Sequence, residues 1–334
     1  MLNDLETLSN LAGVSGEEEA VRRFLLSRLP DAYEDSRGNV ICHRKGQGNP
    51  LMCCAHMDEV GLIVTDITEG GYLAFRSVGG LDARVLVSKH VRIGTQGVCG
   101  VIGMKAVHLQ SKEERSNPPK EEELFIDIGA SDKNEAADRV CIGDFVSFDT
   151  AFSTFGDGLM KGKALDDRVG CAALLALLSN ERTAYDLYGV FTVGEEVGGL
   201  GARAAALRIK PSAALVMEGT TCSDVLGVPE KDTVTHLGNG VCLPARDRSM
   251  VADRTLRGAL IDTAARYHIP WQEKRTCAGG TDGGAIHTSL GGIPTAVLAV
   301  PCRYIHSPVS VAATADFQAM YHLCSHFVKE GFWI

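Results

Sequence analysis

The sequence has no excess of basic residues, because 33 Lys and Arg stand against 42 Asp and Glu and give a formal net charge of −9 at pH 7. An acidic chain gains nothing from contact with nucleic acids or anionic membranes, so non-specific binders of either class are excluded. Charged residues make up 22% of the 334 residues and apolar residues 45%, which excludes a disordered chain. This length exceeds the roughly 100–200 residues of one domain and predicts a large α/β core with a second module.

Recognisable cysteine and serine motifs are also missing. The 11 cysteines are odd in number and contain no Cys-x-x-Cys pair. Most lie in apolar runs such as residues 51–55, where a free thiol behaves as a small hydrophobe. We therefore expect neither a disulfide framework nor a thiolate zinc site. Serine and cysteine hydrolysis lack support, since there is no Gly-x-Ser-x-Gly and Cys53 and Cys54 belong to an apolar run.

The sequence contains no pattern typical of secretion or membrane insertion. Residues 1–6 carry acids where a secretory signal carries bases. Residues 283–302 are uncharged, but Pro294 and Pro301 interrupt them, so we expect no membrane helix there. We therefore expect a soluble, cytoplasmic protein.

Helical and apolar stretches alternate in the first and last parts of the chain. Residues 4–29 have helical spacing, with Ser15 as the expected N-cap of a second helix, and residues 51–55 are typical of a strand buried on both faces. The later elements are expected as helices at 170–178, 201–207, 254–267 and 315–330, and as strands at 187–193, 213–217 and 295–300. The alternation predicts a three-layer α/β/α domain with a mostly parallel mixed sheet.

Residues 61–158 have a different texture, in which short Val- and Ile-rich runs alternate with glycines. This pattern predicts a small all-β module, and the polar run at 112–123 is typical of a solvated loop within it. We therefore expect a discontinuous main domain of residues 1–60 and 159–334, interrupted by an inserted barrel-like domain of residues 61–158.

Five expected strand ends or strand–helix turns carry a histidine or a carboxylate. Because the carboxyl ends of parallel strands meet at one edge of a sheet, we expect these side chains to converge. Two histidines, three carboxylates and a spare glutamate suit a centre of two divalent metal ions. In chain order the side chains are His56 with Asp58, Asp166 with Asp167, Glu195 with Glu196, Glu218, and His306.

The spacing within these groups suggests how the side chains divide their tasks. Asp58 lies two residues after His56, so both point the same way on an extended backbone and Asp58 can fix the His56 tautomer. The doublet 166–167 precedes a predicted helix, and helix capping needs only one carboxylate. Glycines flank Glu195 and Glu196 and allow a turn, so one acid can bind metal while the other handles a proton. Each position alone has a structural explanation, but their convergence favours a metal centre.

Ordered motifs over nearly the whole chain resemble those of the tetrahedral-aminopeptidase family of two-metal peptidases, also called glutamyl or deblocking aminopeptidases. The motifs are Gly13-Val14-Ser15-Gly16, Val78-Gly79-Gly80, residues 124–130, Gly280-Thr281-Asp282-Gly283, and residues 303–308.

The resemblance implies a role for each site residue. His56 and Glu218 would hold one metal ion, Glu196 and His306 would hold the other, and Asp166 would bridge the two. Glu195 would be the general base and Asp58 would orient His56. The resemblance also implies a cis peptide bond between Asp166 and Asp167. The chain departs from many relatives at Glu218, where they carry Asp, and at Ser310, where they often carry an acid.

We therefore expect a metal-dependent aminopeptidase that removes the N-terminal residue from short peptides, with two divalent ions, Zn, Co or Mn, per subunit. The resemblance implies a homo-oligomer, a tetrahedral dodecamer that the β insert helps to build around inward-facing active sites.

Three alternatives to the aminopeptidase remain. They are a β-glucanase, which is a label that relatives have carried, an amidohydrolase or deacetylase, and a metal-stabilised scaffold without activity. A glycosidase needs no bridging Asp and no His ligands, and a scaffold would not need Glu195. We expect His90, His108 and His287 to be structural.

Overall fold

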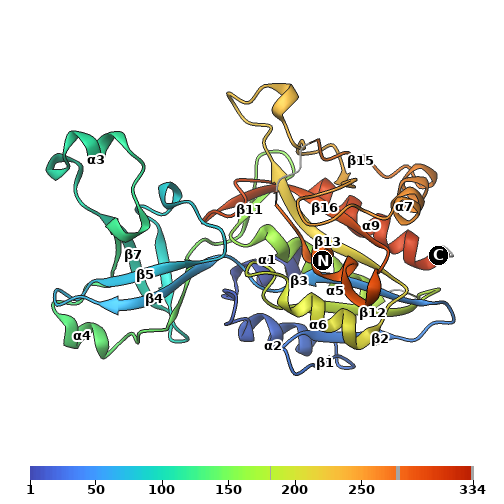
Figure 1. The fold of residues 1–334 in the computed structure, drawn as a ribbon, viewed down its shortest axis with the longest axis horizontal. Helices are drawn as coiled ribbons and strands as arrows, with labels where there is room; N and C mark the ends of the chain where they lie inside the picture. The colour runs from blue at the N-terminus through green and yellow to red at the C-terminus, as the bar shows by residue number, and fades with distance from the viewer. Residues whose placement is uncertain (181, 276–278, 332–334) are drawn as a thin grey trace.

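In the computed structural model, which describes residues 1–180, 182–275 and 279–331, the chain forms a mixed α/β part and a separate antiparallel β-barrel (Figure 1). The barrel lies at one end of the molecule, at the left of Figure 1, and its chain is inserted after strand β3 of the α/β part. This arrangement confirms the predicted fold class.

The α/β part is built on a mixed 11-stranded sheet. Its central strands β12, β3, β13 and β16 run parallel, the strands on either side of them are antiparallel to their neighbours, and the short strands β14 and β15 pair with each other in parallel. Across the sheet the order is β1 (Tyr33–Glu34), β2 (Val40–Arg44), β12 (Asp186–Thr192), β3 (Pro50–His56), β13 (Ala213–Cys222), β16 (Thr295–Arg303), β17 (Ser310–Ala313), β11 (Leu159–Gly162) and β10 (Ser153–Phe155), with β14 (Val241–Cys242) and β15 (Trp271–Gln272) beside β16. Strand β10 belongs to this sheet although its residues lie within the expected insert of residues 61–158.

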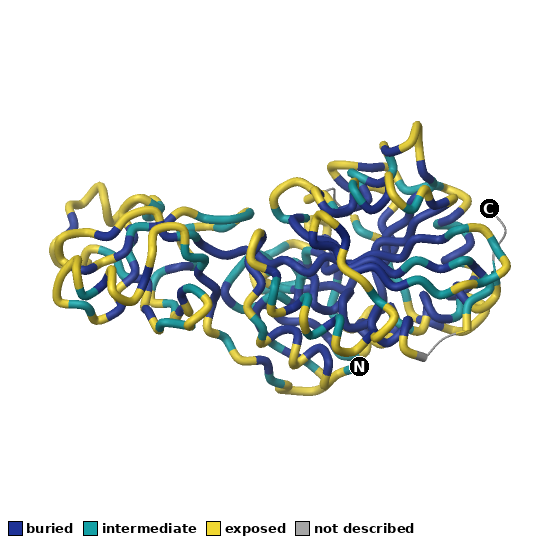
Figure 2. The backbone as a smooth tube through the Cα atoms, turned by 90° about the horizontal axis from the view of Figure 1, so that it is seen from below, coloured by how far each residue is buried: buried dark blue, intermediate teal, exposed yellow. Residues whose placement is uncertain are grey.

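Alternation of side chains along the buried strands divides the core of the α/β part into two layers. Leu51, Cys53 and Ala55 of β3 face one apolar cluster, whereas Met52 and Cys54 face the other, as the period of two in a strand requires. Figure 2 shows the buried backbone concentrated along these strands.

Helices cover both faces of the sheet. The first cluster includes residues of α1 (Leu2–Asn10), α2 (Glu19–Arg28), α5 (Leu165–Asn180), α7 (Arg254–Arg266) and α9 (Thr314–Glu330), and the second includes residues of α6 (Leu200–Ile209) and α8 (Asp282–His287). None of the helices within the described ranges is both long and apolar enough to cross a membrane.

The barrel closes in the order β4-β5-β8-β7-β6-β9 around its own apolar core. Its strands are β4 (Gly61–Ile67), β5 (Leu73–Val78), β6 (His90–Ile93), β7 (Val98–Met104), β8 (Leu124–Asp127) and β9 (Phe145–Phe148), with helices α3 (Lys112–Ser116) and α4 (Lys133–Ala137). Within the insert, short 3-10 helices lie at Ala83–Val85, Val107–Leu109 and Glu121–Glu123. In the α/β part, short 3-10 helices lie at Glu230–Asp232 and Ser289–Gly291.

Two local predictions are wrong. The run 112–123 contains the helix α3, because Ser111 and Glu114 form a capping box. Ser15 does not cap α2, which begins only at Glu19; its hydroxyl donates a hydrogen bond to Asp58 instead.

The ten cysteines in the described ranges are all free, and eight of them are buried. Cys277 lies outside the described residues. The expectation of no disulfide framework is therefore confirmed for the cysteines that the structure describes.

Candidate active site

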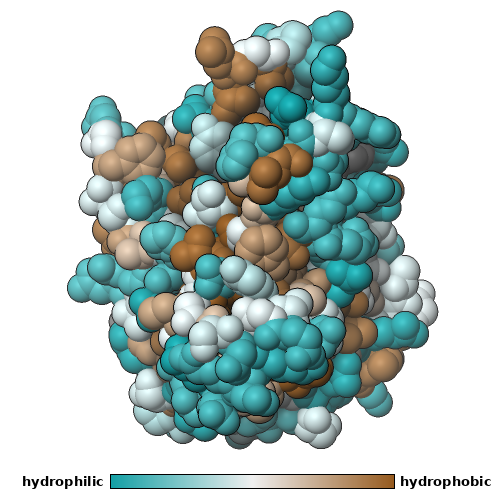
Figure 3. Space-filling view, turned by 90° about the vertical axis from the view of Figure 1, so that its left-hand side faces the viewer, coloured by the Kyte–Doolittle hydropathy of each residue, from teal (hydrophilic) through white to brown (hydrophobic). Residues whose placement is uncertain are grey.

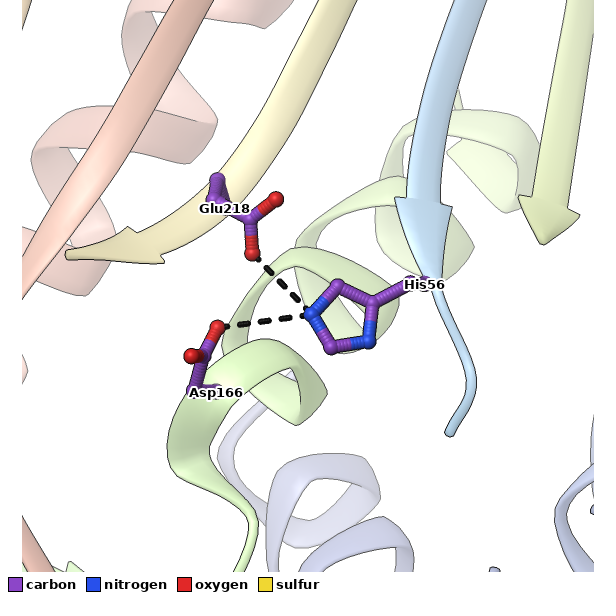
Figure 4. A group of neighbouring side chains, drawn as sticks. All are labelled: His56, Asp166 and Glu218. Atoms are coloured by element: carbon purple, nitrogen blue, oxygen red, sulfur yellow. Dashed lines mark ion pairs between the residues drawn. The ribbon is translucent and has the colours of Figure 1, made fainter. Parts of the chain in front are cut away.

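The carboxyl ends of the central parallel strands bring the expected site residues into one place. His56 is the last residue of β3, Glu195 and Glu196 follow β12, and Glu218 lies within β13. His306 follows β16, and Asp166 lies at the start of α5. Figure 4 shows His56, Asp166 and Glu218 pointing toward one another from three different elements.

The side chains form two groups that share Asp166. Oδ1 of Asp166 lies 3.4 Å from Nε2 of His56, and Oε1 of Glu218 lies 3.2 Å from the same nitrogen. On the other side, Nε2 of His306 is 3.4 Å from Oδ2 of Asp166 and 3.4 Å from Oε2 of Glu196. Within each group, one potential ligand atom per residue lies within 4.8 Å of the others. Asp166 therefore presents a different oxygen to each half.

This set of side chains fits two divalent cations. Oδ1 of Asp166 and Oε2 of Glu218 are buried and have no hydrogen-bond partner in the described part of the chain. Burying an unpaired carboxylate oxygen is costly unless a cation compensates it. Imidazole nitrogen and carboxylate oxygen are ligands for Zn, Co or Mn, so the chemistry of the donors agrees with the geometry.

Burial and neighbouring carboxylates raise the pKa values of the glutamates in the cluster, so nearby positive charge would stabilise their ionised forms. Burial and, next, the charge of Asp166 raise the pKa of Glu196 to about 7. Burial also raises the pKa of Glu195 and of Glu218 well above the usual range. In His306, burial lowers the pKa, but the hydrogen bond and charge of Asp166 outweigh it and raise the pKa to about 9. Bound cations would supply the charge that these protons supply.

The Asp58 carboxylate contacts residues from both groups of side chains. Its carboxylate is fully buried, and Nδ1 of His56 lies 3.3 Å from Oδ1. The backbone N–H groups of Glu195 and Glu196 donate to Oδ1 at 3.0 Å and to Oδ2 at 3.1 Å. Burial raises the Asp58 pKa, but its hydrogen bonds to His56, Ser15 and the Glu195 backbone outweigh this effect and lower it.

The neighbouring acids Asp166 and Asp167 point to different places. The backbone of Asp166 and Asp167 is not helical, and Asp167 caps the part of α5 that follows by accepting a hydrogen bond from the Gly170 N–H at 2.8 Å. It accepts another from the His56 N–H at 3.2 Å. The prediction that one carboxylate caps the helix and frees the other is confirmed. The peptide bond between the two residues is cis, as expected.

Glycines shape the turn that carries the two glutamates. Gly194, Gly198 and Gly199 have φ values of 64°, 116° and 64°. These left-handed conformations strain a residue with a side chain. Both Glu195 and Glu196 line the same cavity as a result, as the flanking glycines predicted.

The cavity over the site has a volume of about 860 Å³. Asp166, Glu195, Glu196, Glu218 and His306 lie on its wall, together with two cationic side chains, Arg203 and Lys274. Hydroxyl-bearing and small residues form much of the remaining wall: Ser249, Thr281, Thr288, Gly280, Gly284 and Ala285.

Sequence reasoning missed several buried residues around the site. Glu59 forms an ion pair with Lys163 at 2.6 Å, and Arg168 approaches the same carboxylate at 3.5 Å. Asp282 accepts a hydrogen bond from Thr192 at 2.5 Å. Glu59, Lys163 and Arg168 lie within three positions of Asp58 or Asp166 in the sequence, and Asp282 belongs to the Gly280-Thr281-Asp282-Gly283 motif; these were the signals available for them. Among the histidines expected to be structural, His287 places Nδ1 3.0 Å from the Gly283 carbonyl oxygen.

Comparison with known proteins agrees with this geometry. The M42 glutamyl aminopeptidase family matches residues 38–323. A lysyl aminopeptidase from Pyrococcus furiosus is 31% identical over 330 residues, which cover 95% of this chain and 94% of the relative.

Two solved structures extend the similarity to the fold. An aminopeptidase from the archaeon Desulfurococcus kamchatkensis matches with a TM-score of 0.94 and 33% identity, covering 98% of this chain and 94% of its own. The Pyrococcus horikoshii TET1 peptidase, which can assemble into a tetrahedron or a large octahedral shell, matches with a TM-score of 0.88 and 31% identity over 99% of both chains. The chain therefore belongs to the M42 glutamyl aminopeptidase family and is an aminopeptidase of this metallopeptidase family.

Proposed function

We propose that this aminopeptidase removes the N-terminal residue from short peptides at a centre of two divalent metal ions. The observation that carries the proposal is the division of Asp166, whose two oxygens face separate His–carboxylate pairs in one cavity. His56 and Glu218 would hold one ion, Glu196 and His306 the other, and Asp166 would bridge them. The ions would be Zn, Co or Mn, since the ligands are all nitrogen and oxygen.

Glu195 is the proposed general base. When bound, two such cations polarise a scissile carbonyl and lower the pKa of a water molecule. Glu195 lines the cavity beside Glu196 and makes no side-chain hydrogen bond within the described structure that would occupy it. It would accept the proton of the attacking water and return it to the leaving amine. Asp58 would keep His56 oriented while this happens.

The cavity wall supports a preference for the side chain of the N-terminal residue. The family description names glutamyl substrates, whereas the P. furiosus relative is a lysyl aminopeptidase, so membership alone does not set the charge. In this chain Arg203 and Lys274 line the cavity, and every acidic residue on the cavity wall is a proposed metal ligand or the proposed base. We therefore propose that the cavity favours acidic N-terminal side chains over basic ones.

Assembly is the second part of the proposal. The P. horikoshii TET1 peptidase can form closed shells, and we propose that this chain forms a homo-oligomer of twelve subunits through the inserted domain of residues 61–158. Val107 and Leu109 of this insert are each 63% exposed. Figure 3 looks onto the barrel end of the molecule, where apolar side chains interrupt the polar surface. Such exposed apolar groups are typical of interfaces.

Replacing Glu195 tests the catalytic proposal. Glu195→Gln keeps the shape but removes the basic oxygen, so we expect kcat for an aminoacyl anilide to fall by roughly 10²–10⁴-fold. Metal content, measured by mass spectrometry, should remain at two ions per chain. The exposed Glu113→Gln variant is the control and should retain full activity. Near-normal turnover of Glu195→Gln with metals bound would refute the assignment.

The alternatives predict different results in the same assays. A glycosidase would cleave a glucan in the presence of a chelator, because its two carboxylates need no metal. An amidohydrolase or deacetylase would prefer blocked N-termini, and a scaffold would assemble without cleaving peptides.

A further inference from the structure

Ser15 lies in the loop between α1 and α2, more than 40 residues before any other residue of the site. It is 5% exposed, and its hydroxyl donates a hydrogen bond of 2.6 Å to Oδ2 of Asp58. We propose that Ser15 is a positioning residue of the metal centre, because its hydroxyl fixes the carboxylate on which both halves of the centre depend. The inference rests on the proposed two-metal function and adds a residue to it.

The Asp58 carboxylate contacts both halves of the proposed metal centre, so a small movement of this side chain affects both. The oxygen that accepts the Ser15 hydroxyl also accepts the N–H of Glu196, a proposed ligand of one ion. The other oxygen accepts the N–H of Glu195 and lies 3.3 Å from Nδ1 of His56, a proposed ligand of the second ion, which also lies 3.1 Å from the Asp58 backbone carbonyl oxygen. Among the described residues, Ser15 is the one side chain that donates to Oδ2, and it thereby restricts rotation of the whole carboxylate.

The loop does not need this hydroxyl to stay in place. The Ser15 N–H donates to the Glu59 carbonyl at 3.3 Å, and the Glu59 N–H donates to the Gly13 carbonyl at 2.9 Å. Oε1 of Glu59 accepts the Gly13 N–H at 2.9 Å, and Nζ of Lys163 donates to the Leu11 carbonyl at 2.6 Å. Because these contacts come from the backbone and from other side chains, loss of the Ser15 hydroxyl should leave the loop in position. The role of the hydroxyl is thus separable from the fold.

The test measures metal binding as well as turnover. In Ser15→Ala, we expect the affinity for Zn at both positions to fall about tenfold, as is common when a residue behind a metal ligand is removed. A titration against a chromophoric chelator measures these affinities without reference to activity. We also expect kcat to fall about tenfold while KM changes less than threefold, since Ser15 is not among the residues that line the cavity over the site.

A matched control is Ser9→Ala. Ser9 is also buried in the N-terminal segment and donates one hydrogen bond of 2.7 Å, but its acceptor is the Lys163 backbone carbonyl. Its loss should leave both metal affinities unchanged. Unchanged affinities in folded Ser15→Ala would overturn the proposal, and a loss confined to one position would overturn the link between the two halves.

Two further variants keep the test decisive if Ser15→Ala does not fold. Ser15→Thr retains the hydroxyl and should bind metal as the wild type does, whereas Ser15→Cys offers only a weak donor and should bind less tightly. Equal binding by both variants would overturn the proposal. A wild type that binds fewer than two ions would instead refute the proposed function, so the two failures are distinguishable.

Discussion

At the scale of single residues, neighbouring acids in this chain have separate tasks. Asp166 presents both oxygens to the cavity side, whereas Asp167 holds α5 and the His56 backbone. Glu196 faces His306, whereas Glu195, the proposed base, lines the cavity. In a pair of adjacent acids before a helix, one acid is sufficient to cap the helix. The second acid then has no structural role and becomes a candidate site residue.

Arg203 allows a residue-scale test of the substrate preference. Arg203→Glu should lower the ratio of kcat/KM for a glutamyl anilide over a lysyl anilide by about tenfold or more, because a cation on the cavity wall becomes an anion. Arg208→Glu is a matched control, since it changes the same charge on the exposed surface of the same helix without lining the cavity. Equal effects of the two variants on the ratio would refute the preference.

The predicted set of site residues lies together because its members lie near the carboxyl ends of neighbouring parallel strands or at the start of α5, and most of these ends were visible as apolar runs. Ser15 was misassigned for a related reason. Its spacing to the following glutamates is that of a capping box, but a buried carboxylate 43 positions away is its acceptor. Local pattern rules do not include partners at that separation.

At the scale of elements, one buried acid links α8 to β12 through a hydrogen bond from Thr192. Asp282 is 1% exposed, and its Oδ1 has no hydrogen-bond partner among the described residues. Burial raises its pKa from 3.8 to about 6, against the opposing hydrogen bond of Thr192. The folded chain therefore holds a proton that the unfolded chain has already released between these pH values.

This linkage predicts the pH dependence of stability. The stabilising effect of the protonated form is complete below about pH 4 and is lost as the pH rises through about 6, a change of at most about 3 kcal/mol. Asp282→Asn cannot titrate, so its free energy of unfolding should change less than that of the wild type between pH 4 and 7. Urea unfolding with a chelator present measures both curves, and parallel curves would contradict the prediction.

Most long elements were predictable because their apolar periodicity continues over several turns or strand residues. The closing helix, expected at 315–330, spans Thr314–Glu330, and the run 51–55 lies inside β3. The short helix α3 was not predictable from apolar spacing, since none of its residues is buried. Its capping box, rather than a core contact, defines it.

At the scale of the whole molecule, the proposed metal centre and the proposed assembly surface belong to different parts of the chain, although the Gly80 carbonyl of the insert lies 3.0 Å from Nδ1 of His306. The proposed metal and base residues all come from the α/β part of a single chain, at one edge of its sheet. The barrel has its own apolar core and exposes Val107 and Leu109 beside β7. A subunit released from an assembly should therefore retain a complete site.

This separation leads to a prediction for the Val107→Lys, Leu109→Lys double variant. Two added charges on an apolar contact surface cost free energy when that surface is buried. We therefore expect light scattering to show a smaller particle than the wild type, while metal content and cleavage of an aminoacyl anilide stay within twofold. Ser116→Lys with Asn134→Lys adds the same charge at exposed polar positions of the insert and should leave the assembly intact. A double variant of unchanged mass would show that other surfaces hold the subunits together, and a smaller particle that lost its metals would show that the site depends on assembly.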